Sequence, residues 1–242
     1  MYKRPVSNLS FLQLNENNLV YKAARLLQEE FALTDGISVK LTKRIPVAAG
    51  MAGGSTDAAA MLYAMNQLYD LVLSRRELMK RGVQIGADVP YCLMRGTALA
   101  EGIGEKLTQL PPMIKCPVLI AKPSISVSTK FVYQNLKLDE QTNHPDIDAL
   151  MKDIREKDYD ALAAHMANVL EAGTIPNNPV IAEIKQQMMR SGAKASMMSG
   201  SGPTVFGLFE DGETAKRALR EMKRSGLAKQ VYLTTIYNNR RK

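Results

Sequence analysis

The strongest constraint in this chain of 242 residues is a run of very small side chains between two patterned segments. Residues 37–41 alternate apolar and polar side chains, which is the period of a half-buried strand. Residues 47–54 are mostly alanine and glycine, and residues 55–69 have the composition and spacing of a long helix. The sequence therefore predicts a strand, a loop of small residues and a helix in direct succession.

Such a loop suits an anionic ligand. Glycine lets the backbone approach a ligand closely, and the free N–H groups and dipole at a helix start favour a phosphate. Ser55 and Thr56 add hydroxyl donors. The loop is not a Walker loop, because no lysine precedes Ser55. The alternative is a loop that only lets a helix pack closely on a sheet, and we favour phosphate binding over it.

Two carboxylates stand near predicted helix or turn positions. Asp57 lies in the first turn of the predicted helix, where complementation of the helix dipole is worth roughly 0.3–1 kcal/mol. A functional role for Asp57 would need a nearby cation, because a carboxylate beside phosphates otherwise repels them. Asp88 lies in Gly86-Ala87-Asp88-Val89-Pro90. From its position alone, a capping role is favoured over that of a general base toward a substrate hydroxyl.

A third segment, residues 198–204, predicts a tight, hydroxyl-rich turn between two short strands. Gly200, Ser201 and Gly202 form its centre. Either it is a simple glycine turn, or it forms a second backbone wall near an anionic ligand. The residues alone leave both interpretations open.

The remaining pattern predicts an α+β protein, because helices and strands do not alternate strictly. We place a boundary near residues 123–127, which gives domains 1–124 and 125–242. Helices are expected at 19–31, after the capping-box spacing Ser74–Glu77, and at 128–138, 146–155, 158–171, 178–190 and 214–224. Strands are expected at 91–94, 97–100, 118–121, 195–199, 204–209 and 230–237.

Composition narrows the class of protein. The net charge is +8, but the chain has no Trp and only 6% aromatic residues, so a stacking platform for single-stranded nucleic acid is poorly provided. No apolar run approaches the ~18 residues of a membrane span, and no signal peptide is expected. The chain has only two cysteines, which we expect to be reduced thiols in a cytoplasmic protein. With only two histidines as well, no metal site is predicted in the chain itself.

Taken together, residues 45–66, the segment Gly86–Pro90 and the turn Ser199–Pro203 resemble the GHMP kinase superfamily. Three ordered motifs at compatible spacings make the resemblance specific, and it extends from about residue 6 to residue 237. It implies a two-domain α+β architecture. The N-terminal domain would be like ribosomal protein S5, and incomplete here, and the C-terminal domain would be a ferredoxin-like α/β domain.

The resemblance also implies a reaction. Within the superfamily, these motifs most resemble those of a kinase of isoprenoid precursor synthesis. That kinase uses ATP and Mg²⁺ and transfers the γ-phosphoryl group to the 2-hydroxyl of a cytidyl-diphosphate substrate. Asp88 would take the proton of the attacking hydroxyl, and Gly200, Ser201 and Gly202 would lie near substrate or phosphate. The ATP-binding residues would be Pro46, Val47, Ala48, Ala49, Gly50, Met51, Ala52, Gly53, Gly54, Ser55 and Thr56.

One part of the family pattern is missing. Family members carry an early Pro-x-Lys-x-Asn motif whose lysine assists the catalytic aspartate, and residues 1–5 do not fit it. We therefore expect an N-terminally shortened form with low or absent kinase activity, either a monomer or a homodimer. The alternatives are a catalytically silent nucleotide-binding or oligomerising protein, another kinase of the superfamily such as a homoserine or mevalonate type, and a basic RNA-binding module.

Overall fold

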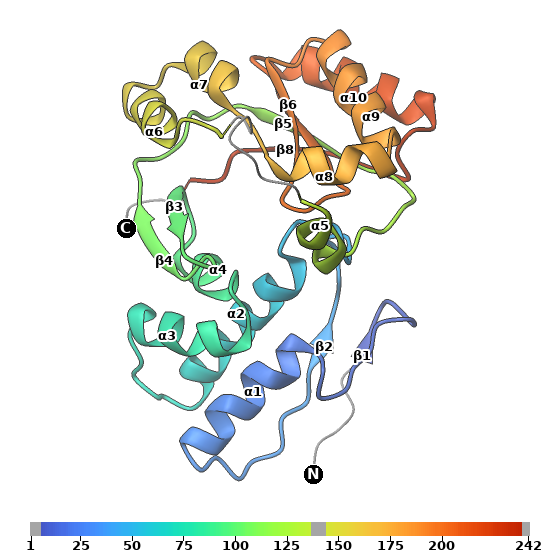
Figure 1. Ribbon diagram of the computed structural model, residues 1–242. Helices are drawn as coiled ribbons and strands as arrows, with labels where there is room; N and C mark the ends of the chain where they lie inside the picture. The colour runs from blue at the N-terminus through green and yellow to red at the C-terminus, as the bar shows by residue number, and fades with distance from the viewer. Residues whose placement is uncertain (1–5, 137–143, 239–242) are drawn as a thin grey trace. The chain divides into compact units, whose positions relative to one another are not determined.

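The computed structural model describes residues 6–136 and 144–238, and the chain forms two compact units (Figure 1). Unit 1 contains the chain up to Val47 together with Ala52–Gln109. Unit 2 contains Ala48–Met51 together with the chain from Leu110 onward. The centre of the small-residue loop thus belongs to unit 2, whereas both of its ends belong to unit 1.

The division after Gln109 differs from the domain boundary expected at residue 124. The reason is strand β5 (Pro117–Lys122), which pairs with β7 on one side and β8 on the other. A strand with two neighbours lies inside its sheet, so β5 belongs with the C-terminal elements although it precedes the proline-marked break at Pro123.

Unit 1 is a cluster of helices beside two small strand pairs. Its core is formed by side chains that include Leu27, Leu62, Met65, Leu78 and Val89. The short strands β1 and β2 pair in parallel, and β3 and β4 form an antiparallel hairpin. The elements are β1 (Val6–Ser7), α1 (Leu19–Glu30), β2 (Lys40–Leu41), α2 (Gly53–Leu68), α3 (Arg75–Ile85), α4 (Val89–Met94), β3 (Ala98–Glu101) and β4 (Lys106–Gln109).

Side-chain caps explain where two of these helices begin. The carboxamide of Asn18 accepts the N–H of Val20 at the start of α1. Ser74 and Glu77 form the predicted capping box of α3, with each side chain accepting a backbone N–H of the other. The spacing of apolar residues and the capping residues together were enough to predict both helices.

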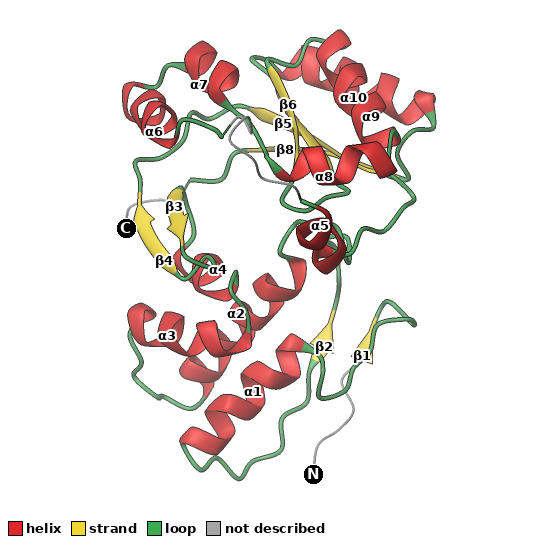
Figure 2. Ribbon diagram, in the orientation of Figure 1, coloured by secondary structure: helices red, strands yellow, loops and turns green. Residues whose placement is uncertain are grey.

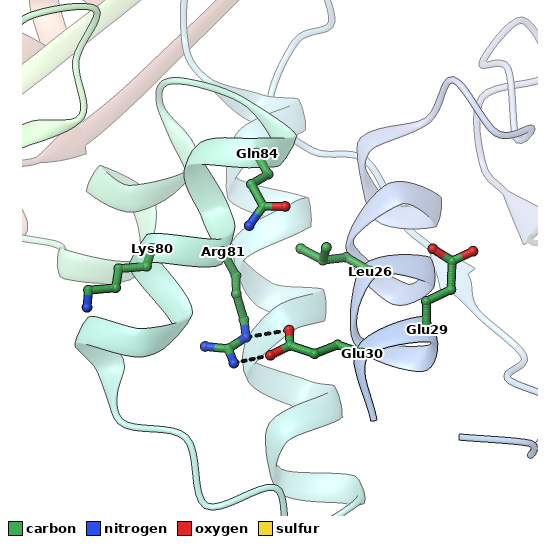
Figure 3. A pocket seen from close by; sticks show the side chains of 6 residues that line it. All are labelled: Leu26, Glu29, Glu30, Lys80, Arg81 and Gln84. Carbon is green, nitrogen blue, oxygen red and sulfur yellow. Dashed lines mark hydrogen bonds and ion pairs between the residues drawn. The ribbon is translucent and has the colours of Figure 1, made fainter. Parts of the chain in front are cut away.

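An open groove separates the exposed faces of α1 and α3 (Figure 3). The guanidinium of Arg81 crosses it, donates two hydrogen bonds to the carboxylate of Glu30 and lies 5.7 Å from the centre of the Phe31 ring. This charge pair and cation–π contact tie the two helices together. The groove is lined by Leu26, Glu29, Glu30, Lys80, Arg81 and Gln84.

Two strand predictions in unit 1 need correction. The strand expected at 91–94 is wrong, because this segment is the end of helix α4. Pro90 stands in the first turn of α4, where its fixed φ suits a helix, and Leu93 and Met94 are buried with Val89. The strand expected at 37–41 is reduced to Lys40–Leu41, whose partner is β1.

Unit 2 contains a four-stranded antiparallel sheet in the order β6-β7-β5-β8. Along the chain, β5 is the first strand of this sheet and β8 is the last. The sheet order and the β-α-β-β-α-β connection are those of a ferredoxin-like domain, as expected. The elements beyond β5 are α5 (Thr129–Asn135), α6 (Ile147–Glu156), α7 (Tyr159–His165), α8 (Leu170–Thr174), the 3-10 turn η1 (Ile175–Asn177), α9 (Val180–Arg190), β6 (Ala195–Met198), β7 (Val205–Leu208), α10 (Gly212–Ser225) and β8 (Gln230–Thr235).

The sheet of unit 2 has apolar residues on both faces. Helices α9 and α10 cover one face, where Leu119 packs among side chains that include Ile184 and Met222 (Figure 2). Val118 and Leu208, paired across β5 and β7, point to the other face with Tyr159 of α7. In the described ranges, no helix combines the length and apolar character needed to cross a membrane.

The single helix expected at 158–171 is wrong. The chain instead forms α7 and α8, with a break at residues 166–169. Asn168 lies in this break, and its carboxamide oxygen accepts the N–H of Leu170. Asparagine often turns the backbone in this way, so apolar periodicity alone did not reveal the interruption.

Candidate active site

The small-residue loop has an unusual backbone. Ala48, Gly50 and Ala52 all have positive φ, at 50°, 69° and 47°. The left-handed conformation costs alanine about 1–2 kcal/mol, and strain of this kind concentrates at binding and catalytic sites. Left-handed residues at alternate positions are also typical of backbone concavities that bind anions through successive N–H groups.

Helix α2 begins directly after this loop without a side-chain cap. Its N-cap residue, Ala52, has no polar side chain, so no cap hydrogen bond is made. The first N–H groups of a helix lack intrahelical partners, and here they stay available to a ligand. A Cβ at Gly53 would lie 3.0 Å from Cγ2 of Ile45, so a larger residue there would require the Ile45 side chain to shift.

The two hydroxyl groups predicted as phosphate donors are arranged differently from expectation. Thr56 Oγ1 donates to the carbonyl oxygen of Ala52 at 3.0 Å, and the Ser55 side chain is buried. The donors that the structure leaves available at this position are therefore backbone N–H groups of the helix start rather than these two hydroxyls.

Asp57 has the cation that a functional role would require. Its carboxylate forms an ion pair with Nζ of Lys43, whose side chain is only 5% exposed. Asn8 holds the backbone of Lys43 from the other direction, since its carboxamide accepts the Lys43 N–H at 2.8 Å and donates to the Lys43 carbonyl at 3.1 Å. The sequence analysis missed this pairing, because residues 8, 43 and 57 are distant in the chain and follow no motif.

Asp88 occupies the N-cap position of α4, but its side chain makes no capping hydrogen bond. The capping role favoured from the sequence position is therefore wrong. The residue is exposed, and its carboxylate forms no ion pair with any residue in the described part of the chain. A carboxylate in this state is free to accept a proton from a ligand.

Cys92 places Asp88 and the start of α2 in one neighbourhood of unit 1. Its Sγ lies 3.5 Å from Oγ1 of Thr56. Burial raises the pKa of the Cys92 thiol most, the contact with the Thr56 hydroxyl lowers it, and the nearby carboxylates of Asp88 and Asp57 raise it. No sequence pattern indicated this position of Cys92, since a lone cysteine follows no motif.

The third motif contacts the centre of the loop, within unit 2. Ser199 Oγ donates to the carbonyl oxygen of Gly50 at 2.8 Å, and a Cβ on Gly50 would lie 2.2 Å from the Ser199 carbonyl oxygen. Gly200 and Gly202 both have positive φ, at 56° and 82°. Ser201 Oγ lies 2.9 Å from Thr129 Oγ1 of α5. The turn therefore supports the loop through backbone contacts that only glycine permits.

Comparisons with known proteins identify the family of the chain. The family model described as the GHMP kinases N terminal domain matches residues 18–96, and the model described as GHMP kinases C terminal matches residues 150–228. Both predicted halves of the superfamily pattern are thus present in the order expected.

Two bacterial kinases are highly similar to this chain in sequence. The chain is 56% identical to the 4-diphosphocytidyl-2-C-methyl-D-erythritol kinase of Lachnospira eligens, over 96% of this chain and 80% of that protein. It is 53% identical to the kinase of the same name from Lachnoclostridium phytofermentans, over 97% of this chain and 80% of that protein.

Solved structures show the same fold. A crystal structure of 4-(cytidine 5'-diphospho)-2C-methyl-D-erythritol kinase superposes with a TM-score of 0.80 at 28% identity, covering 97% of this chain and 82% of that one. Homoserine kinase from Cytophaga hutchinsonii superposes with a TM-score of 0.84 at 21% identity, covering 98% and 82%, which shows the fold alone. On the strength of the family models and the sequence relatives, the chain belongs to the GHMP kinases and, within them, to the family of 4-diphosphocytidyl-2-C-methyl-D-erythritol kinases.

Proposed function

We propose that this protein transfers the γ-phosphoryl group of ATP to the 2-hydroxyl of 4-diphosphocytidyl-2-C-methyl-D-erythritol, a step in the methylerythritol phosphate route to isoprenoid precursors. Membership of the kinase family supports the substrate and the reaction type. The observation that carries the proposal is the unpaired carboxylate of Asp88 in the same unit as the uncapped start of α2, with Cys92 close to both.

The loop of residues 46–56 binds the ATP phosphates in this proposal. Its uncapped N–H groups and the positive end of the α2 dipole attract anionic oxygens. Asp57 would repel the same phosphates, but the ion pair with Lys43 neutralises its charge. Gly200 and Gly202 act by supporting Gly50. The hydroxyl of Ser201 is not assigned to phosphate binding, because it already contacts the hydroxyl of Thr129.

Asp88 is the general base. It accepts the proton of the substrate 2-hydroxyl while the hydroxyl oxygen forms a bond to the γ-phosphorus of ATP. The bond between that phosphorus and the bridging oxygen breaks, and ADP leaves with the electron pair. General base catalysis of this kind contributes roughly 10²–10⁴ in rate. Most of the remaining acceleration in phosphoryl transfer comes from positioning and charge stabilisation.

The donor groups present fit a magnesium ion that arrives with the nucleotide. No group of three or more His, Cys, Asp or Glu residues in the described part of the chain is arranged to hold a metal ion. Mg²⁺ needs only one or two carboxylates when substrate phosphates and waters complete its shell. Phosphate oxygens and waters would supply most of its ligands, Asp88 stays the proton acceptor, and the ion would neutralise charge on the transferring phosphoryl group.

The experiment is a coupled assay of ADP release with ATP, Mg²⁺ and the cytidyl-diphosphate substrate, combined with calorimetric titration of ATP. We expect ATP binding and ADP release that depends on the cytidyl substrate. ATP binding without any turnover would select the catalytically silent nucleotide-binding alternative. Absence of both would contradict the proposal, and equal turnover with homoserine or mevalonate would contradict the substrate.

A further inference from the structure

Asn168 holds the third motif through backbone groups. This residue lies in the break between α7 and α8, and its carboxamide nitrogen donates to two carbonyl oxygens. These are the carbonyls of Met198 at 2.9 Å and of Gly200 at 2.8 Å. The carboxamide oxygen accepts the N–H of Leu170 at 3.0 Å. Every polar atom of the side chain is therefore engaged, and both donor bonds end on the third motif.

Glu171 of α8 holds the same segment of the third motif. Its Oε1 accepts the N–H of Met198 at 2.8 Å, and its other oxygen forms an ion pair with Lys185 of α9. Side chains of the α8 region thus satisfy both the N–H and the C=O of Met198, at the point where strand β6 ends. These side chains therefore add outside support to a turn that also has its own backbone hydrogen bonds, from the Ser199 N–H to the Thr204 carbonyl and from the Gly202 N–H to the Ser199 carbonyl.

The third motif in turn contacts the centre of the small-residue loop, which also belongs to unit 2. Gly50 packs closely against the turn, since a Cβ placed on Gly50 would lie 2.2 Å from the Ser199 carbonyl oxygen and 3.0 Å from that of Gly202. The carbonyl oxygen of Gly50 accepts the hydrogen bond of Ser199 Oγ. A shift of Ser199 or Gly200 would therefore move residues 48–51, which include two residues with positive φ.

We propose that Asn168 is a positioning residue for nucleotide binding: its two donor bonds hold the Met198–Gly200 backbone in the conformation that supports the centre of the ATP phosphate loop. The proposal rests on the proposed function for the identity of the ligand. It assigns no contact between Asn168 and the nucleotide. The side chain acts only through the turn and Gly50.

A purely local role for Asn168 would be to start helix α8, and the two roles separate by substitution. Asn168→Asp keeps an oxygen that can accept the Leu170 N–H, but it removes both donors and places a carboxylate beside two carbonyl oxygens. If the local role were the whole role, N168D would behave like the parent chain. If positioning is the role, N168D is at least as impaired as Asn168→Ala.

The test measures hydrogen exchange and ligand binding for N168D, N168A and a matched control. The control is Asn178→Asp, because the Asn178 carboxamide also donates to a backbone carbonyl of unit 2, that of Thr174 at 2.9 Å, away from the third motif. Exchange is followed in peptides covering residues 48–51 and 198–204. Calorimetry gives the Kd for ATP and for the cytidyl-diphosphate substrate separately, and circular dichroism checks that each variant folds.

We expect N168D and N168A to exchange faster in both peptides and to bind ATP about tenfold more weakly, with the Kd of the cytidyl substrate unchanged. N178D should match the parent in both measurements. Parent-like exchange and ATP affinity in N168D would overturn the proposal. A parent chain that binds no ATP would contradict the proposed function, and the exchange difference between N168D and N178D would still support or overturn the positioning of the loop.

Discussion

Two carboxylates of unit 1 look alike in the sequence and are different in the structure. Asp57 and Asp88 each follow a stretch of small residues and stand near the start of a helix. Asp57 is paired with the buried lysine Lys43, whereas Asp88 has neither a capping bond nor an ion pair among the described residues. Pairing makes the first carboxylate part of the framework and leaves the second available for chemistry.

The difference also bears on how an anion could bind near α2. An unpaired Asp57 would repel a phosphate at the start of the helix, but the ion pair with Lys43 neutralises the charge of its carboxylate. Asp88 has no such partner among the described residues, and it lies close enough to Cys92 for its carboxylate to raise the pKa of the thiol. The local environment, and not the residue type, separates the two roles.

The largest expected effect tests the free carboxylate. Asp88→Asn should lower kcat by roughly 10²–10⁴, because the base that accepts the hydroxyl proton is lost. The melting temperature should not change, since no cap or ion pair depends on this side chain. Asp70→Asn, at an exposed position of the same unit, is the control and should keep full turnover. A D88N variant with more than a tenth of the parent rate would remove Asp88 from the mechanism.

The second prediction tests the paired carboxylate. Lys43→Met should lower the free energy of unfolding by about 2–3 kcal/mol, because Asp57 is left without its partner. This is less than for a fully buried pair, since the Asp57 side chain remains 22% exposed. Urea denaturation measures the loss.

A double variant separates the pair from its parts. K43M with Asp57→Asn should recover much of the stability, because no unpaired charge remains. If the loss of stability in the double variant equals the sum of the losses in K43M and D57N, the ion pair contributes nothing. In that case the contrast between Asp57 and Asp88 would lose its energetic basis.

A smaller effect contrasts a true cap with Asp88. Ser74→Ala should lower the free energy of unfolding by about 1 kcal/mol, because the Ser74 hydroxyl caps α3 and the capping box is lost. D88N should lose nothing in the same urea measurement. An equal loss in both variants would mean that Asp88 stabilises its helix after all.

The same cap predicts a pH dependence. Hydrogen bonds from the Ser74 side chain and backbone hold the pKa of Glu77 below its usual value of 4.5. A lowered pKa in the folded state gives stability that is present above the unfolded pKa and is lost as pH falls through the folded pKa. The parent should therefore lose stability on acidification below about pH 4.5, and S74A should lose less over that range in pH-dependent urea titrations.

The smallest effect uses Cys92 as a probe of both carboxylates. Because burial and then the two carboxylates raise its pKa, iodoacetamide should react slowly at neutral pH and faster above pH 9, the usual pKa of a thiol. ATP should slow the reaction further, since Thr56 at the start of α2 lies beside the sulfur. Mass spectrometry of the peptides measures both rates.

Cys116 of unit 2 is the matched thiol. Burial also raises its pKa, but it lies in the cluster with Val118 and Leu208 and away from the loop. Its rate of alkylation should not respond to ATP. Equal protection of both thiols by ATP would indicate a general tightening of the protein and would remove Cys92 as a sign of nucleotide at α2.

The local elements of this protein could be predicted where short-range rules act alone. Helices with a capping residue and a regular apolar stripe, such as α1 and α3, follow from hydrogen bonds and contacts within a few residues. The strand-strand-helix-strand order after residue 190 follows in the same way from pattern and turns. The loop and the two other motifs were sufficient to predict the kinase family.

Only the tertiary structure determined which polar groups are paired. The partner of Asp57 lies 14 residues away, the support of Gly50 comes from a turn 149 residues away, and Asn168 breaks a helix while bonding to residues 30 and 32 positions further on. Segment 91–94 became a helix because burial beside Val89 outweighed its strand-like composition. Hydrogen bonds and ion pairs between distant residues depend on how the chain packs, and no local pattern encodes them.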